Sequence, residues 1–353
     1  MTFALDHYVP VLKVKRGEKK ALQLIAPALQ HRITPLLEIV VRKDDKDVDA
    51  HLNTAFKDLA VSVRPYSRCF LDVREMAADG PSAAFEAFSR AAAAGIVFTP
   101  VTGLTRSADV QATLSNRTHG VALRLTRAEF EYGGISGKLW DFMGLHGLTP
   151  EDTDLIVDLG PVDDLVTAGV KALTDAFLAD VPDHSRWRTF IIAACAFPSS
   201  MGGVNRNSYK TIERTDWKAW RDGLYARRHT LPRLPTFSDG AIQHPAGVEG
   251  FNFLTMQVSA SIRYTSSDDW LLIKGESTKL TPPGMQFPAL ATQLVSGRLR
   301  SHFSGASHCG GCNAMQASAP GAPGLGSAEV WRRLGTIHHI TTVTKDLSLL
   351  PWP

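Results

Sequence analysis

The sequence lacks most of the features that would place it in a specialised class of protein. Only four cysteines occur among 353 residues, and they suggest no disulfide framework. No apolar run approaches the ~18–20 residues that a membrane-spanning helix needs, and residues 1–10 do not resemble a secretory signal. The formal net charge is only +3, whereas nucleic-acid-binding domains are typically strongly basic. We therefore expect a globular protein of the reducing cytoplasm that does not contact a membrane.

What the sequence contains is a regular alternation of short apolar runs and segments with helical spacing. Apolar residues make up 44% of the chain and charged residues 21%, which is typical of a globular domain with a full core. Eight runs have the length and composition of buried strands. They occupy residues 9–15, 33–39, 69–73, 95–101, 120–125, 154–160, 189–195 and 234–239.

The segments between these runs favour helices that would cover a parallel sheet. Residues 16–30, 47–61, 81–95 and 162–181 carry apolar residues at helical spacing. Right-handed crossovers turn such an alternation into a parallel sheet, and eight strands can close it. We therefore predict an α/β fold of the TIM type, a (β/α)8 barrel. An open Rossmann sheet is the alternative, which is weakened because no GxGxxG follows the first run.

The pattern changes after residue 240. Residues 259–276 predict an inserted β-hairpin, and residues 288–300 predict a closing helix. We expect residues 1–303 to form a single barrel domain that includes this hairpin. Residues 304–328, rich in Gly, Ala, Ser and Pro, predict a flexible loop. Residues 329–353 would form a C-terminal extension, with a short helix that stops at Gly335, and would pack on the barrel.

Charged residues near the ends of several runs predict a functional mouth. Side chains alternate between the two faces of a strand, so Leu12 and Val14 should face the helices while Lys13 and Lys15 point into the barrel. The same alternation points further charged residues inward from the later runs. These are Glu38, Asp72, Arg74, Arg124, Asp158 and Asp239. Barrels of this class carry their active sites at the carboxyl ends of the strands.

Two interpretations of this charged mouth remain open. Isolated buried charges are costly, so the residues must pair with one another, bind a metal ion or face a wet pocket. They could form an internal salt-bridge network that fills the top of the barrel. Alternatively, the same network could line a ligand site in which Lys13, Lys15, Glu38, Asp72, Arg124 and Asp158 are catalytic.

The loop at residues 197–210 is a second candidate site. It places Ser199, Ser200, Gly202 and Gly203 directly after the seventh run, and small residues let backbone N–H groups approach an anion. Phosphate sites in these barrels often follow strands seven and eight. A plain flexible loop would explain the composition equally well.

A third candidate is the sequence His308-Cys309-Gly-Gly-Cys312. It could bind zinc, form a redox-active pair, or be an incidental feature of a loop. Structural zinc needs four ligands, and further histidines follow at His302, His338 and His339. The last two could instead be packed histidines, or could perform acid–base chemistry at the mouth.

The sequence also resembles a known family at both ends. Residues 8–22 (YVPVLKVKRGEKKAL) and 33–38 (ITPLLE) resemble the beta family of bacterial and phage proteins. Residues 262–276 and 331–341 are similar to its C-terminal part. The resemblance implies phage, prophage or defence-linked settings, with a possible partner protein from the same operon, and no established activity. By position it singles out Lys13, Lys15, Glu18, Glu38, Arg263, Tyr264 and Lys274.

Two functions follow from these observations. The first is a recognition module whose mouth binds an anionic ligand, either a phosphate-bearing small molecule or nucleic acid, or a partner protein. Its ligand-binding residues would be Ser199, Ser200, Gly202, Asp239, Arg263, Tyr264 and Lys274. The alternative is a metal-assisted phosphodiesterase or nuclease-like hydrolase in which Glu38 and Asp72 hold a divalent metal ion or act as acid and base. Lys13, Lys15 and Arg124 would stabilise the anionic group.

One observation can separate the two functions. Direct pairing of Lys13 with Glu38 favours the recognition module, whereas an ion or phosphate bound by Glu38 and Asp72 favours catalysis. No recognisable hydrolase motif such as HExxH supports the second function.

Overall fold

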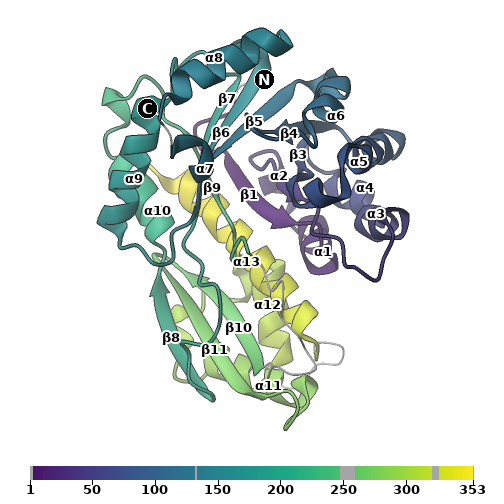
Figure 1. Ribbon diagram of the computed structural model, residues 1–353. Helices are drawn as coiled ribbons and strands as arrows, with labels where there is room; N and C mark the ends of the chain where they lie inside the picture. The colour runs from purple at the N-terminus through teal and green to yellow at the C-terminus, as the bar shows by residue number, and fades with distance from the viewer. Residues whose placement is uncertain (1–2, 132, 247–258, 320–325, 353) are drawn as a thin grey trace.

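The computed structural model describes residues 3–131, 133–246, 259–319 and 326–352 and contains a closed eight-stranded parallel barrel (Figure 1). Its strands follow one another in chain order around the barrel. They are β1 (Tyr8–Lys13), β2 (Leu36–Glu38), β3 (Cys69–Asp72), β4 (Phe98–Thr102), β5 (Val121–Thr126), β6 (Thr153–Pro161), β7 (Thr189–Cys195) and β9 (Thr236–Asp239). The predicted TIM-type barrel is therefore confirmed.

Helices cover the outside of the barrel, as the sequence pattern predicts. They are α1 (Arg16–Gln23), α2 (Pro27–Gln30), α3 (Val48–Phe56), α4 (Leu59–Val63), α5 (Pro81–Ala93), α6 (Val110–Ser115), α7 (Arg127–Phe130), α8 (Ile135–His146), α9 (Thr167–Asp180) and α10 (Thr215–Ala219). Helix α5 begins with Pro81 in its first turn, where a missing N–H is harmless. It ends just before Gly95, whose φ of 68° suits a glycine stop.

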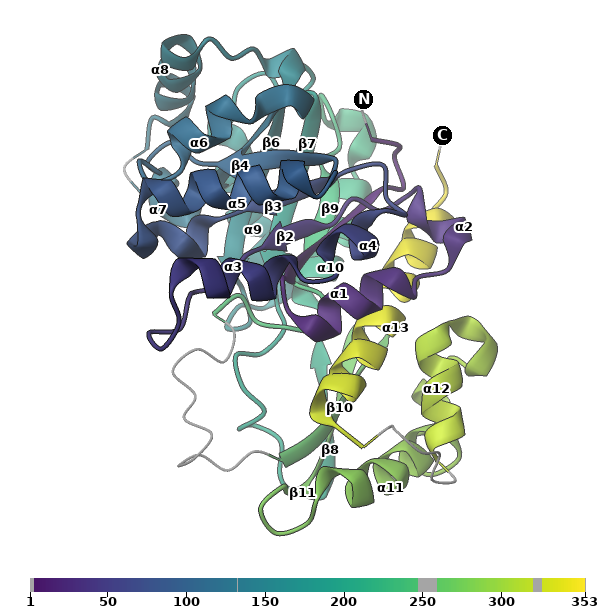
Figure 2. The same cartoon turned by 90° about the vertical axis from the view of Figure 1, so that its right-hand side faces the viewer.

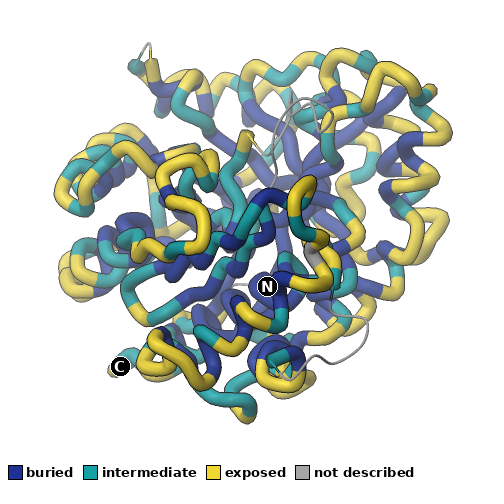
Figure 3. Tube along the Cα trace, turned by 90° about the horizontal axis from the view of Figure 1, so that it is seen from below, coloured by how far each residue is buried: buried dark blue, intermediate teal, exposed yellow. Residues whose placement is uncertain are grey.

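The alternation of side chains along the strands separates two cores. Val9, Leu36, Phe70, Ala122 and Ile156 are among the residues that pack inside the barrel. Their neighbours in sequence face outward and pack against the helices. Buried residues accordingly gather in the interior of the molecule and exposed residues at its periphery (Figure 3). Because the parity is regular, the last inward position of each strand faces the mouth.

A second sheet lies beside the barrel. The predicted hairpin is confirmed as β10 (Ser259–Ser266) and β11 (Asp269–Ser277). A third strand, β8 (Ser208–Glu213), pairs antiparallel with β11 and lies partly in the segment expected to be a loop. Helices α11 (Pro283–Val295) and α12 (Gly310–Ser318) lie beside this sheet (Figures 1 and 2).

The C-terminal helix α13 (Ala328–Leu349) connects the two parts. It packs against β10, α1 and α12 and touches β1, and in Figure 2 it runs from the second sheet up along the barrel. None of the described helices combines the length and the apolar character that crossing a bilayer requires.

Two expectations for this region are wrong. Residues 310–318 form a helix rather than part of a flexible loop, because their buried residues Cys312 and Met315 join the core and burial compensates for weak helix propensity. Helix α13 also continues through Gly335 instead of stopping there. A Cβ atom at Gly335 would lie 2.7 Å from the carbonyl oxygen of Arg263, so this glycine permits close packing.

Gly335→Ala should destabilise the protein although alanine is the better helix former. The helix propensity gains about 1 kcal/mol, but the clash with the Arg263 carbonyl should cost about 1–3 kcal/mol. Gly137→Ala in α8 is the matched control, because a Cβ there meets nothing within 4 Å. Chemical denaturation should show a lower midpoint for the first variant and an equal or higher one for the second. If the denaturation midpoint rose equally in both variants, the close packing at Gly335 would be contradicted.

Candidate functional site

Arg124 lies at the centre of a network of charges in the barrel mouth. Its guanidinium contacts three carboxylates, with N–O distances of 2.6 Å to Glu38, 2.8 Å to Asp72 and 2.7 Å to Asp158. These residues come from β5, β2, β3 and β6, at the inward positions that alternation predicts. The structure thus brings together the residues predicted from these four strands.

Further cations surround the same carboxylates. Lys13 Nζ lies 2.9 Å from Glu38 Oε2, and Arg74 lies 3.0 Å from Glu38 Oε1. Arg106, from the segment after β4, lies 2.7 Å from Asp72. Each of these carboxylates is therefore held by at least two cations, and Lys13 is paired directly with Glu38.

The electrostatics of the mouth keep its acids ionised. Burial alone would raise the pKa of Glu38, but Arg124, Lys13 and Arg74 lower it to about 2. Burial would also raise the pKa of Asp72, yet Arg106 and Arg124 hold it well below its usual range. Efficient general acid–base catalysis needs a pKa near the working pH. Neither residue meets that condition, which speaks against their predicted acid–base roles.

The mouth has little room for a ligand. The space bordered by Lys13, Glu38, Arg124 and Asp158 amounts to about 30 Å³, which is room for roughly one water molecule. Within the described part of the chain, the one Cys/His/Asp/Glu cluster compact enough to share an ion does not involve these acids. The network therefore matches the salt-bridged filling of the barrel top better than the metal-assisted hydrolase.

Lys15 does not share the mouth with Lys13. It lies instead in a cavity of about 650 Å³ beside the mouth, between the segment after β1 and the segment after β2. Residues of α1 and α3 are among those that line this cavity. Seven of its fourteen lining residues are basic, and Asp58 is the single acid among them. The basic residues are Lys15, Arg16, Lys19, Lys20, Lys43, Lys46 and Lys57.

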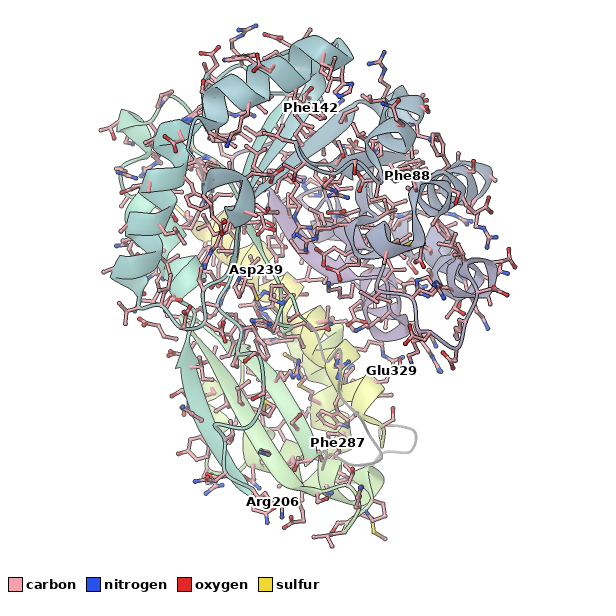
Figure 4. All side chains as sticks on the ribbon, in the orientation of Figure 1. Phe88, Phe142, Arg206, Asp239, Phe287 and Glu329 are labelled. Carbon is pink, nitrogen blue, oxygen red and sulfur yellow. The ribbon has the colours of Figure 1, made fainter. Side chains whose placement is uncertain are left out.

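Two of these cations have defined structural partners. The ammonium group of Lys19 donates to the carbonyl oxygens of Thr54 at 3.1 Å and Ala55 at 2.8 Å, at the C-terminal end of α3. A cation there interacts favourably with the helix dipole. Arg16 lies 3.3 Å from Glu329, the acid that opens α13 and is labelled in Figure 4. Lys43, by contrast, is exposed on the loop after β2.

Asp239 faces away from the barrel interior, so its predicted place in the mouth is wrong. The register pairs Val9 with Ser238, which gives Ser238 the inward position and turns Phe237 and Asp239 outward. Asp239 accepts hydrogen bonds from Tyr8 Oη at 2.5 Å and His339 Nε2 at 3.0 Å. Figure 4 shows Asp239 where β9 meets α13.

His339 is a packed histidine and not an acid–base group of the mouth. Its ring is fully buried, and Nδ1 lies 2.8 Å from the Thr265 hydroxyl. Burial lowers the pKa of His339 although Asp239 acts in the opposite direction. This histidine therefore joins α13 to β9 and β10.

The loop at residues 197–210 does not form the predicted phosphate cradle. The N–H of Ser199 donates to the Asp163 carboxylate at 3.2 Å, and that of Gly202 donates to the Ser200 hydroxyl at 3.1 Å. Lys274 donates to the carbonyl oxygens of Met201 and Val204, each at 2.9 Å. Two of the backbone donors expected to bind an anion, and the ammonium group of Lys274, are thus used within the protein.

Two further family-motif residues, Arg263 and Tyr264, are engaged away from the mouth. Arg263 donates to the carbonyl oxygen of Ile242 at 2.7 Å and stacks over the Phe197 ring. The Tyr264 hydroxyl accepts the N–H of Ser304 at 2.9 Å and lies 3.4 Å from Cys312 Sγ. Both residues hold the second sheet in place, so their predicted ligand-binding roles lack support.

A larger cavity, of about 780 Å³, opens at the opposite end of the barrel, where Arg68 and Arg188 are among its lining residues. Both arginines bind the buried carboxylate of Asp154 at 2.6 Å. Active sites of these barrels lie at the carboxyl ends of the strands, whereas the amino-terminal face serves stability. The cavity of about 650 Å³ that Lys15, Lys43 and Lys57 help to line, called the lysine-rich cavity below, is therefore the better candidate site despite its smaller volume.

The structure defines a β/α-barrel protein with a salt-bridged mouth and a basic cavity beside it. The family described as Beta protein matches residues 8–345, and the chain belongs to that family. No curated protein matches the chain. A solved structure, thiamine phosphate pyrophosphorylase from Pyrococcus furiosus, is 12% identical, with 67% of this chain and 87% of that chain covered and a TM-score of 0.33. That likeness is too low to carry a functional argument.

Proposed function

We propose that this protein is a recognition protein that binds a phosphate-bearing, nucleotide-like ligand in the lysine-rich cavity. The observation that carries the proposal is the composition of the cavity wall, in which half of the lining residues are basic. Its volume of about 650 Å³ lies within the roughly 300–1,000 Å³ of typical small-molecule sites.

The position of the cavity supports the same proposal. Its walls come from the segments that follow β1 and β2, on the face where barrels of this class bind their ligands. The neighbouring mouth is filled by ion pairs and would act as a rigid support. The phosphates of a bound nucleotide would lie among these cations. The cations already line the cavity before the nucleotide binds, so their charges need not be brought together by binding.

The family resemblance extends the proposal to its setting. Phage, prophage and defence-linked contexts involve nucleotides and nucleic acids. A partner protein from the same operon would respond to the ligand-bound form of this protein. We place this protein in the cytoplasm, where such ligands occur. The ligand we propose is a nucleoside triphosphate rather than a nucleic-acid strand, because the cations that carry the proposal line one cavity of about 650 Å³.

A charge-reversal pair tests the site. Lys43→Glu/Lys46→Glu should weaken ATP binding by roughly 10- to 100-fold, because two charge-assisted contacts are lost and two repulsive charges are added. The matched control is Lys171→Glu/Lys210→Glu, which changes the net charge equally outside the cavity. Calorimetric titration should show wild-type affinity for the control and weaker binding at higher salt for every form.

Three results would contradict the proposal. They are absence of ATP binding to the wild-type protein at low salt, equal weakening in both double variants, or preferential binding of a single-stranded oligonucleotide over ATP. The last result would point to a nucleic-acid partner instead.

A further inference from the structure

We propose that Cys309, Cys312 and His338 form a binding site for a thiophilic divalent cation of the Zn²⁺ class. The site lies where α12 meets α13 and shares no residue with the lysine-rich cavity. The inference therefore stands independently of the proposed anion-binding function.

The spacing of the three side chains suits a tetrahedral ion. His338 Nδ1 lies 3.1 Å from Cys312 Sγ and 3.9 Å from Cys309 Sγ, and all three ligand atoms lie within 4.8 Å of one another. In a tetrahedral zinc site, bond lengths of about 2.0–2.3 Å place neighbouring ligand atoms roughly 3.6–3.8 Å apart. Shifts of about half an ångström would bring these atoms to that geometry.

The orientation of His338 provides a second, independent observation. Its ring is fully buried, and Nε2 lies 2.7 Å from the carbonyl oxygen of Thr265. A carbonyl oxygen can only accept, so Nε2 carries the proton and donates it. In the neutral form of the ring, Nδ1 then carries a lone pair instead of a proton and faces the two sulfur atoms. Histidines that bind metals are typically held by a hydrogen bond of this kind on the other ring nitrogen.

The turn that carries the cysteines is built against α13. Cys309 Sγ accepts the backbone N–H of Cys312 at 3.2 Å, which places both sulfur atoms on the same side of the turn. A Cβ atom at Gly311 would lie 2.5 Å from the carbonyl oxygen of Leu334. Only glycine therefore lets the turn approach α13 closely enough for the cysteines to reach His338.

Neighbouring aromatic and polar groups hold the site in shape. The ring of Tyr264 stacks on His338 with a centroid distance of 3.8 Å, and its hydroxyl lies 3.4 Å from Cys312 Sγ. Cys312 is fully buried, whereas Cys309 is partly exposed. The exposed side of Cys309 leaves the fourth coordination position to water, as in sites with three protein ligands.

Bound metal would fasten α12 to α13. The ion would join the turn before α12 to the middle of the long helix, which itself contacts the barrel. A cation in this place would therefore strengthen the connection between the second sheet and the barrel. The sequence leaves His302, His338 and His339 open as further ligands, and among the described residues only His338, 26 residues from Cys312 in the chain, joins the two cysteines in a compact cluster.

Metal analysis of the purified protein tests the site. Full-length protein prepared without chelators and with added Zn²⁺ should contain about one equivalent of zinc per chain. Cys309→Ser/Cys312→Ser should reduce this to below about a tenth. The matched control is Cys69→Ala/Cys195→Ala, which also removes two thiols but leaves the site intact; it should retain the full equivalent.

A second measurement keeps the test decisive where the serine variant fails to fold. Reduced, metal-free wild-type protein should bind one equivalent of Zn²⁺ in competition with a chromophoric chelator, and His338→Gln should bind it more than about 100-fold more weakly. Co²⁺ in place of Zn²⁺ should give a thiolate-to-metal charge-transfer band. Absence of stoichiometric binding by the reduced wild type would overturn the proposal. So would a Cys309–Cys312 disulfide in protein prepared with Zn²⁺, which would indicate a redox pair instead.

Discussion

Arg124→Met should lower the free energy of unfolding by roughly 3–5 kcal/mol, because it leaves three buried carboxylates without their shared partner. Lys13, Arg74 and Arg106 remain beside these acids but cannot replace a guanidinium that contacts all three. Urea denaturation of the purified variant measures the loss directly. The effect should exceed that of any other single substitution in the mouth.

Arg186→Met is the control for this prediction. Arg186 also pairs with two acids, at 3.0 Å and 3.2 Å, but on the surface, where it is half exposed. Exposed pairs contribute about 0–1 kcal/mol, so this variant should unfold almost as the wild type does. If Arg124→Met were equally harmless, the mouth would be a hydrated pocket and not a filled core.

Acid should unfold the protein over a range set by the mouth carboxylates. Glu38 has a pKa of about 2 in the folded protein, below its usual value, and the pKa of Asp72 is also lowered. Groups whose pKa is lowered by folding stabilise the protein above the unfolded-state pKa and lose that contribution as the pH falls. The contribution of these two carboxylates to stability should therefore be constant above about pH 5 and decline towards pH 2.

The expected size of this decline can be given for Glu38. Lowering the pKa of Glu38 from its ordinary value of 4.5 to about 2 corresponds to about 3 kcal/mol, and Asp72 adds to it. Denaturation midpoints measured between pH 7 and pH 2 would reveal the loss, and Glu38→Gln should flatten the profile while it lowers stability at neutral pH. A flat profile in the wild type would mean that these acids are not paired in solution.

The sequence predicts the barrel well because apolar runs and helical segments alternate regularly along it. Short apolar runs separated by amphipathic helices favour one architecture, and alternation within the runs correctly places Lys13, Glu38, Asp72, Arg124 and Asp158 at the mouth. Alternation also holds in the last strand, but there the prediction assigns the inward face to the wrong residues. Phe237 looks like an interior residue, but on the helix side it meets the ring of Trp217 edge to face and that of Trp220 at a tilted angle, and Asp239 therefore faces outward as well.

The lysine-rich cavity illustrates what a sequence cannot reveal. Its cations come from three separated segments, near Lys15, Lys43 and Lys57, and none forms a recognisable motif. Lys15 lies beyond the end of β1 at Lys13, so strand alternation does not apply to it and its predicted place in the mouth is wrong. Helix α12 was missed for a different reason. Its glycine-rich start has weak helix propensity, and packing against α13 decides its structure.

Hydrogen–deuterium exchange with and without ATP tests most directly where the ligand binds. We predict slower exchange at residues 14–20 and 40–46, which border the lysine-rich cavity, and unchanged exchange at residues 199–206. Protection confined to residues 199–206 or to the segments around Arg74 and Arg106, or no protection at any saturating ATP concentration, would contradict the account.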